Sequence, residues 1–133
     1  MGSQLLPTAP LYKWVGVGWN GLIMAKLSRT LHNSLPLLQA LLETESVHHY
    51  SQLIQSKQLQ NSISEITRNL LESNLPIAKK YRGLLRREES TLTVLAAKSE
   101  EKLSVLSSAK GKKVLKLLLR ATLPILKRHV KNN

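Results

Sequence analysis

The 133-residue sequence contains no cysteine, no aspartate and no phenylalanine. Without cysteine, the chain has no disulfide framework, no thiolate metal ligand and no thiol nucleophile. Serines are plentiful, but no motif singles one out as a nucleophile, and the aspartate of a usual catalytic triad is missing. We therefore expect a protein that is not an enzyme, with no cofactor and no small-molecule substrate.

Leucine dominates what is present, with 28 residues against 20 for valine, isoleucine and threonine together. Unbranched leucine keeps its rotamer freedom in a helix, so this balance favours helices over strands. We predict an all-α fold: a helical hairpin or bundle of four to five helices, with an extended N-terminal arm and a basic amphipathic C-terminal helix.

The net charge of +12 is concentrated at the two ends of the chain. Residues 1–42 carry +3, residues 43–101 are neutral, and residues 102–133 carry +9 without any acid. This pattern indicates terminal contacts with something anionic, joined by a body that packs on protein. We divide the chain into an arm with a short apolar segment (1–21), a neutral helical body (22–108) and a basic helix (109–133).

The apolar segment at residues 14–25 is too short to cross a bilayer as a helix, because twelve residues rise only about 18 Å. Tyr12, Trp14 and Trp19 are amphipathic rings that favour the membrane interface, so we predict that they anchor the chain to a membrane or to a partner. Gly16 to Gly21 match GxGxxG, but no βα pattern surrounds them, and we reject a nucleotide site.

A capping residue stands two positions before proline at Ser34-Leu35-Pro36, Asn74-Leu75-Pro76 and Thr122-Leu123-Pro124. Proline fits the first helical turn, where its missing N–H is not needed. We predict that the first two of these tripeptides start helices, and that the third kinks a helix that continues through Pro124.

Residues 47–73 give the longest uninterrupted helical pattern. Its apolar positions repeat at 4-3-4 spacing and form the predicted partner-helix face, which consists of Leu59, Ile63, Ile66 and Leu70. The glutamines and serines of this segment are expected on a solvated outer face; they are Gln52, Gln55, Gln58, Gln60, Ser62 and Ser64. Two heptads are too few for an independent coiled coil, which favours a bundle.

Another helical pattern follows Pro76, and a hinge near residues 88–90 would split it into two helices. Lys79, Arg82 and Arg86 form a basic row on this segment. Farther on, Gly111 is the predicted stop of the preceding helix.

The C-terminal segment is the strongest functional signal. On a helical wheel, the basic residues gather within about 100°; they are Lys112, Lys113, Lys116, Arg120, Lys127 and Lys131. The opposite side carries the apolar residues Val114, Leu115, Leu118, Leu119, Ile125 and Leu126. Such a helix lies on anionic membranes, fits a groove or binds phosphate backbones. An ordinary solvated lysine face is the alternative.

Glu45 and His48 have the spacing of two metal ligands on one helix, but a di-iron bundle needs a second copy, which this sequence lacks. A partly exposed helix end is therefore the preferred interpretation of this pair.

These patterns predict a non-catalytic accessory or assembly subunit of a larger complex, whose basic termini contact anionic lipid and whose other partners are protein subunits. The basic ends and the apolar segment with Trp14 and Trp19 predict association with the mitochondrial inner membrane, and the acid-free N-terminal region partly fits a mitochondrial presequence. The alternative is a nucleic-acid-binding protein, such as a ribosome-associated subunit, in the cytoplasm or nucleus.

Overall fold

The computed structural model describes residues 27–97 and 100–131, with side chains up to Arg128. These residues form seven helices and no strand. The helices are α1 (Arg29–Glu43), α2 (Val47–Ile54), α3 (Lys57–Leu71), α4 (Lys79–Arg86), α5 (Glu89–Ala96), α6 (Glu101–Ser107) and α7 (Ala109–Lys131). The all-α prediction is confirmed for these residues, whereas the expected count of four to five helices is not. The predicted arm lies outside them.

Serine hydroxyls set the start of four helices. Ser28, Ser46, Ser56 and Ser108 each accept a hydrogen bond from the backbone N–H three residues later, at 2.9–3.2 Å. Each bond satisfies one of the N–H groups that the first helical turn leaves without a partner. The cap at Ser56 divides the predicted 47–73 helix into α2 and α3.

Pro36 does not start a helix, contrary to the sequence prediction. It lies in the middle of α1, which begins at Arg29 behind the Ser28 cap. Ser34 caps nothing, because its hydroxyl donates to the Thr30 carbonyl one turn earlier, at 2.8 Å. The helix continues past Pro36 because its leucines are buried on both sides of that residue, at Leu31, Leu35, Leu38 and Leu41.

Asn74 ends a helix where the sequence predicted a helix start. Its N–H bonds the Asn69 carbonyl at 2.8 Å, and the N–H of Ser73 bonds the Leu70 carbonyl at 3.1 Å. Ser73 has a φ of 63°, so α3 closes with the two bonds of a Schellman motif, with serine in the place usually held by glycine. The next helix, α4, begins only at Lys79, three residues after Pro76.

The structure settles two points that the sequence left open and corrects one prediction. A break at Arg87 and Glu88 separates α4 from α5, close to the proposed hinge, and α7 continues through Pro124. Gly111, however, is no helix stop, because it is the third residue of α7. It lies so close to α6 that an added Cβ would stand 1.6 Å from the Val105 carbonyl oxygen.

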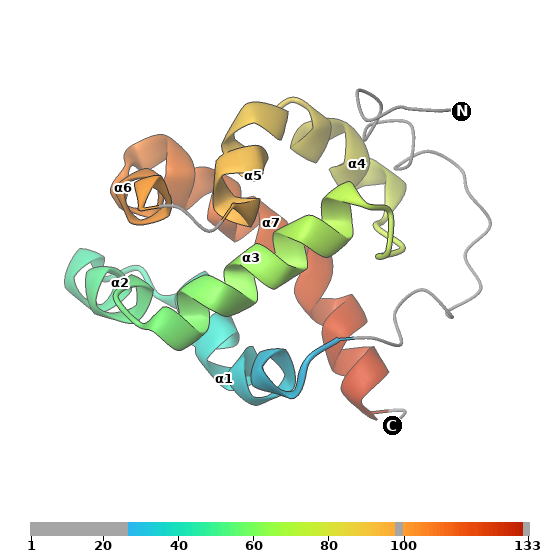
Figure 1. Ribbon diagram of the computed structural model, residues 1–133, viewed down its shortest axis with the longest axis horizontal. Coiled ribbons are helices and arrows are strands. Elements are labelled where there is room, and N and C mark those ends of the chain that lie inside the picture. The colour runs from blue at the N-terminus through green and yellow to red at the C-terminus, as the bar shows by residue number, and fades with distance from the viewer. Residues whose placement is uncertain (1–26, 98–99, 132–133) are drawn as a thin grey trace.

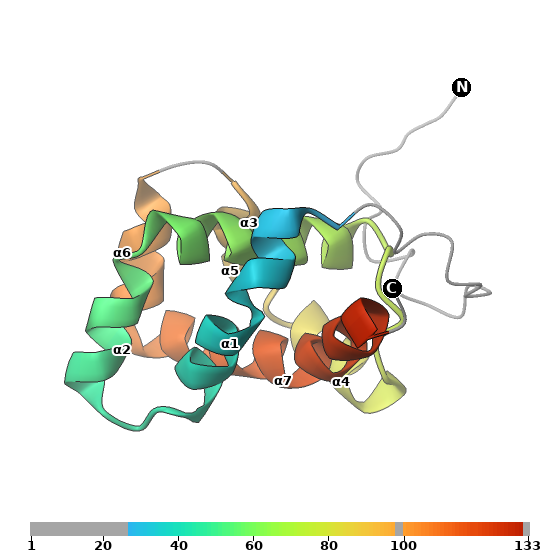
Figure 2. The same ribbon diagram turned by 90° about the horizontal axis from the view of Figure 1, so that it is seen from below.

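The helices surround one apolar core in which α1 and α5 each contact both α3 and α7. Figure 2 shows α3 and α7 at two levels, with α1 crossing from one to the other. In Figure 1, α2 and α6 lie side by side at one end of the molecule. Leucines supply most of the core, including Leu38, Leu59, Leu92, Leu106 and Leu118.

Candidate functional site

The α7 helix separates apolar from basic residues as the wheel predicted. Every member of its apolar set is buried in the core, namely Val114, Leu115, Leu118, Leu119, Ile125 and Leu126. Of the predicted basic row, Lys113, Arg120 and Lys127 are exposed, while Lys112 and Lys116 are half-buried. Lys131 belongs to α7, but its side chain lies outside the described residues.

Three of these basic side chains contact the fold itself. The Lys116 ammonium donates to the Thr44 carbonyl at the end of α1, at 2.6 Å. The Lys112 ammonium lies 5.0 Å from the centre of the Tyr50 ring. Lys127 donates to the side-chain oxygen of Gln39 on α1. One edge of the basic row therefore packs against α1 and α2. The helical wheel could not distinguish these contacts from exposure to solvent, because it describes one helix alone.

The other edge of α7 faces solvent. Lys113, Arg120 and Arg128 are exposed there, and α7 contains no acid that could pair with them. Among the described residues, the single salt bridge joins Lys110 at the start of α7 to Glu88, at 3.6 Å. Positive charge on this edge is available for contact with another molecule.

The predicted second basic row lies on α4, which packs against α7 (Figure 2). Lys79 and Arg86 are exposed and Arg82 is half-buried. Residues 73–87 and 109–131 together hold thirteen basic residues and no acid, whereas the other described residues hold four basic residues and all eight glutamates. We call the exposed positive surface of these two segments the basic face.

The predicted anchors Tyr12, Trp14 and Trp19 lie outside the described residues. The predicted partner-helix face, formed by Leu59, Ile63, Ile66 and Leu70, is buried in the core of this same chain. The expected solvated outer face is confirmed at Gln52, Gln55 and Gln58, which are exposed, and is wrong at Gln60, Ser62 and Ser64, which are buried. The reason is that α3 is covered by α1, α2 and α5 on several sides.

Glu45 and His48 do not share a helical face, because Glu45 precedes the Ser46 cap of α2. Within residues 27–97 and 100–131, no group of three or more histidine and glutamate side chains is placed to hold a metal ion. No helix in that part of the chain is both long and apolar enough to span a membrane.

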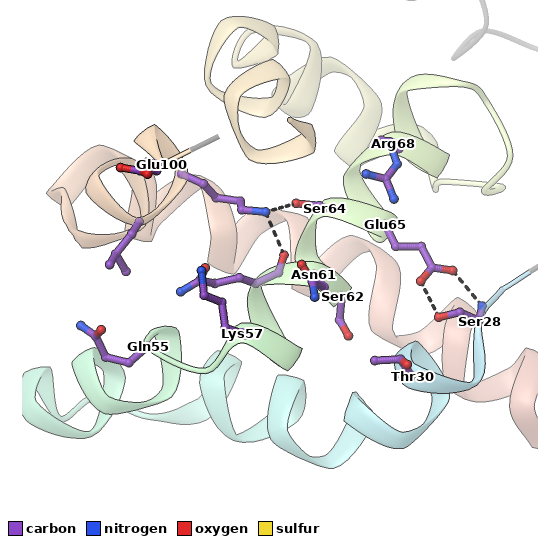
Figure 3. A pocket seen from close by; sticks show the side chains of 13 residues that line it. Ser28, Thr30, Gln55, Lys57, Asn61, Ser62, Ser64, Glu65, Arg68 and Glu100 are labelled. Atoms are coloured by element: carbon purple, nitrogen blue, oxygen red, sulfur yellow. Dashed lines mark hydrogen bonds between the residues drawn. The ribbon is translucent and has the colours of Figure 1, made fainter. Parts of the chain in front are cut away.

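A polar cavity of about 760 Å³ lies on the side of α3 that faces the start of α1 and the start of α6 (Figure 3). Lys102 from α6 reaches into it with only 5% of the residue exposed. Its ammonium lies 2.5 Å from the Ser64 hydroxyl and 3.4 Å from the Gln60 carbonyl oxygen. Lys102 belongs to no motif in the sequence, and its position one turn before the buried Leu106 places it on the inner face of α6.

The Lys102–Ser64 pair does not have the hydrogen-bond pattern of a Ser–Lys catalytic dyad. Ser64 donates its own proton to the Leu95 carbonyl at 2.8 Å, so it accepts from the ammonium. A lysine that acts as a base would instead be neutral and would accept the serine proton. The pair therefore acts as a polar contact that holds Lys102 against α3.

Comparison of the chain with protein-family models, with curated proteins and with solved structures gives no match.

Proposed function

We propose that this protein is a non-catalytic helical accessory subunit that attaches to an anionic membrane through its basic face. The separation of charge is the observation that supports this proposal. The helices α4 and α7 pack together, and the segments that contain them, residues 73–87 and 109–131, hold thirteen basic residues and no acid. A solvated surface without a partner gains from mixing both signs of charge, because i,i+4 pairs stabilise helices. A face of one sign instead attracts an anionic counterpart.

The surroundings of Leu84 favour lipid over nucleic acid. Leu84 on α4 is 45% exposed, and Lys80 and Arg87 lie one helical turn away on the same side. An apolar side chain among cations suits a headgroup layer, where it enters the acyl boundary while the cations contact phosphates. A single-strand binding surface would need exposed rings for base stacking, but the Tyr81 ring is half-buried and is contacted by the Lys80 ammonium at 5.1 Å.

The composition of the first 42 residues, which hold three basic residues and no acid, supports a mitochondrial location, and the basic face supports attachment to a membrane there. In this proposal the membrane contact orients the protein, and its partners are other protein subunits at that membrane.

The test is co-sedimentation of the full chain with phosphatidylcholine vesicles that contain or lack cardiolipin. We expect binding only to the anionic vesicles. The variant Lys113→Gln/Arg120→Gln loses about 2 kcal/mol, or roughly 30-fold in affinity, because each cation near the surface contributes about 1 kcal/mol.

The matched control is Arg29→Gln/Lys57→Gln, which removes the same charge from exposed positions outside the basic face. It is expected to bind nearly as well as the unmodified chain. Equal losses in the two variants would contradict a specific face. Binding to RNA in place of vesicles, with a steep salt dependence, would favour the nucleic-acid alternative.

A further inference from the structure

The outward side of α1 is an uncharged surface that no other described helix covers. Residues 30–42 contain no lysine, arginine or glutamate. Asn33, Pro36 and Leu37 are exposed on α1, and Ala40 is half-buried. Figure 1 shows α1 at the lower edge of the molecule, and Figure 2 shows it in front of α3. The core of a protein–protein interface is depleted of charge in the same way.

One charged residue stands at each end of this surface. Arg29 is the first residue of α1 and Glu43 is the last, and both are exposed. Each has the sign that the helix macrodipole disfavours, because a helix N-terminus prefers anions and a C-terminus prefers cations. The Gln39 amide donates to one Glu43 oxygen at 2.8 Å, which leaves the other for an outside donor. A partner that offers an anion to Arg29 and a cation to Glu43 would compensate both charges.

The same helix in a second copy of the chain is such a partner. On a helical wheel, one face of α1 spans about 80°; its members are Arg29, Asn33, Pro36, Ala40 and Glu43. Pro36 lies midway between the two charged residues. If two copies of α1 pack antiparallel about a twofold axis at Pro36, Arg29 of each copy lies opposite Glu43 of the other. The small side chains of Pro36 and Ala40 allow the two helix axes to approach closely.

We propose that α1 forms the interface of a symmetric homodimer, in which two copies of the chain pack antiparallel through this face. Two ion pairs between Arg29 and Glu43 fix the register, and the uncharged centre of the face is buried between them. Leu37, which is 40% exposed in the single chain, lies at the margin of this centre. The contact uses no residue of the basic face, so it is independent of the proposed membrane attachment.

The charge order of α1 selects a second copy over an unrelated protein. A partner without the reversed order of charges would place like charges together, which suppresses binding. The pairing of one 15-residue helix with itself buries less than the roughly 1,200–2,000 Å² of a stable interface. We therefore expect a weak, reversible dimer with a Kd of about 100 µM, so that vesicle assays at about 1 µM measure the monomer.

The first test is sedimentation equilibrium of the full chain from about 10 µM to 1 mM, in about 0.15 M sodium chloride to screen general repulsion. We expect a monomer–dimer equilibrium. A monomer at every concentration, or assemblies that grow beyond a dimer, would overturn the proposal.

Charge reversal tests the register of the two helices. Arg29→Glu and Glu43→Arg each place like charges at both ends of the symmetric interface, so each is expected to weaken self-association roughly tenfold. Both changes suit the helix macrodipole, so neither threatens the fold of α1. An equimolar mixture of the two variants is expected to regain the affinity of the unmodified chain, because each copy then supplies the sign that the other lacks.

The matched control pair is Lys57→Glu and Glu72→Arg, which makes the same changes at exposed positions at the two ends of α3, a helix of equal length. Self-association of this pair is expected to stay nearly unchanged, alone or mixed. General repulsion between chains of net charge +12 predicts that Arg29→Glu strengthens association, because it lowers that charge. The expected weakening is therefore specific to the antiparallel register.

NMR shifts that depend on protein concentration locate the contact. We expect these shifts at the amides of Asn33, Leu37 and Ala40. Shifts centred on another helix, no gain in affinity when Arg29→Glu and Glu43→Arg are mixed, or an equal loss in the control pair would each overturn the proposal.

Discussion

The hydroxyl of Tyr50 on α2 donates a hydrogen bond of 2.8 Å to the backbone carbonyl of Leu106, in the last turn of α6. Carbonyls in a last helical turn have no partner within their own helix, so this contact satisfies a group that would otherwise be buried and unpaired. The Lys112 ammonium lies over the same ring. One tyrosine therefore joins α2, α6 and the start of α7.

Burial raises the pKa of Tyr50 from 10.0 to about 12. Because the folded protein holds this proton more tightly than the unfolded chain does, the related stability is complete below pH 10 and is lost as the pH rises toward 12. We expect Tyr50→Phe to lower the free energy of unfolding at pH 8 by about 1–3 kcal/mol, because the Leu106 carbonyl loses its donor. Urea unfolding measures this change.

The same variant is expected to show a smaller decline in stability between pH 10 and 12 than the unmodified chain. Tyr81→Phe, at a half-buried ring on α4, is the matched control for the loss of a tyrosine hydroxyl. Equal pH dependence in Tyr50→Phe and in the unmodified chain would contradict the role given to Tyr50.

Ser73→Gly is expected to stabilise the protein. Ser73 adopts a φ of 63° at the end of α3, a conformation that glycine adopts without the cost of a Cβ, and its buried hydroxyl has no hydrogen-bond partner. The gain should be about 1 kcal/mol, measured as a higher urea midpoint with an unchanged slope. A destabilised Ser73→Gly protein would show that the Ser73 hydroxyl makes a stabilising contact.

Gly111→Ala is expected to be strongly destabilising, because the new Cβ would stand 1.6 Å from the Val105 carbonyl oxygen. Since that oxygen is backbone, α6 and α7 must separate before the methyl group fits. We expect a loss of about 3 kcal/mol or more, as for severe overpacking. Gly83→Ala in α4, where a Cβ meets nothing within 4 Å, should instead be neutral or stabilising. Thermal unfolding of the two variants and the unmodified chain measures the difference.

Lys116→Gln and Lys113→Gln are a matched pair on the two edges of α7. Lys116 donates to the Thr44 carbonyl, whereas Lys113 is exposed. We expect Lys116→Gln to cost about 1.5–3 kcal/mol of unfolding free energy, and Lys113→Gln to stay within about 0.5 kcal/mol of the unmodified chain. A larger loss of unfolding free energy in Lys113→Gln than in Lys116→Gln would show that the stabilising contact of α7 lies on the edge that carries Lys113.

The sequence predicted the elements whose signal is periodic and missed those that depend on local hydrogen bonds. The apolar side of α7 and the inward face of α3 follow from leucine and isoleucine spacing alone. Pro36 and Asn74 misled the prediction because the same residue types occur inside and after helices as well as before them. Only the partners of Ser34 and Asn74 in space decide which role applies.

For the candidate sites too, residue spacing predicts the face of a single helix but not the contacts between helices. A wheel drawn for one helix collects the basic residues of α7, but it cannot show that Lys116 reaches Thr44 or that α4 packs beside α7. The burial of Lys102 is not predictable from its residue type, because lysine is usually exposed, and only its alignment with Leu106 on α6 indicates an inward position.

The most direct test of the basic face is an NMR spectrum of the full chain on cardiolipin vesicles that contain a lipid with a spin-labelled headgroup. We predict selective broadening of signals from α4 and from the exposed edge of α7, at Lys80, Lys113 and Arg120, while Gln52 on α2 and Gln58 on α3 stay sharp. Broadening centred on α2 and α3, or no broadening at all while the protein sediments with the vesicles, would contradict it.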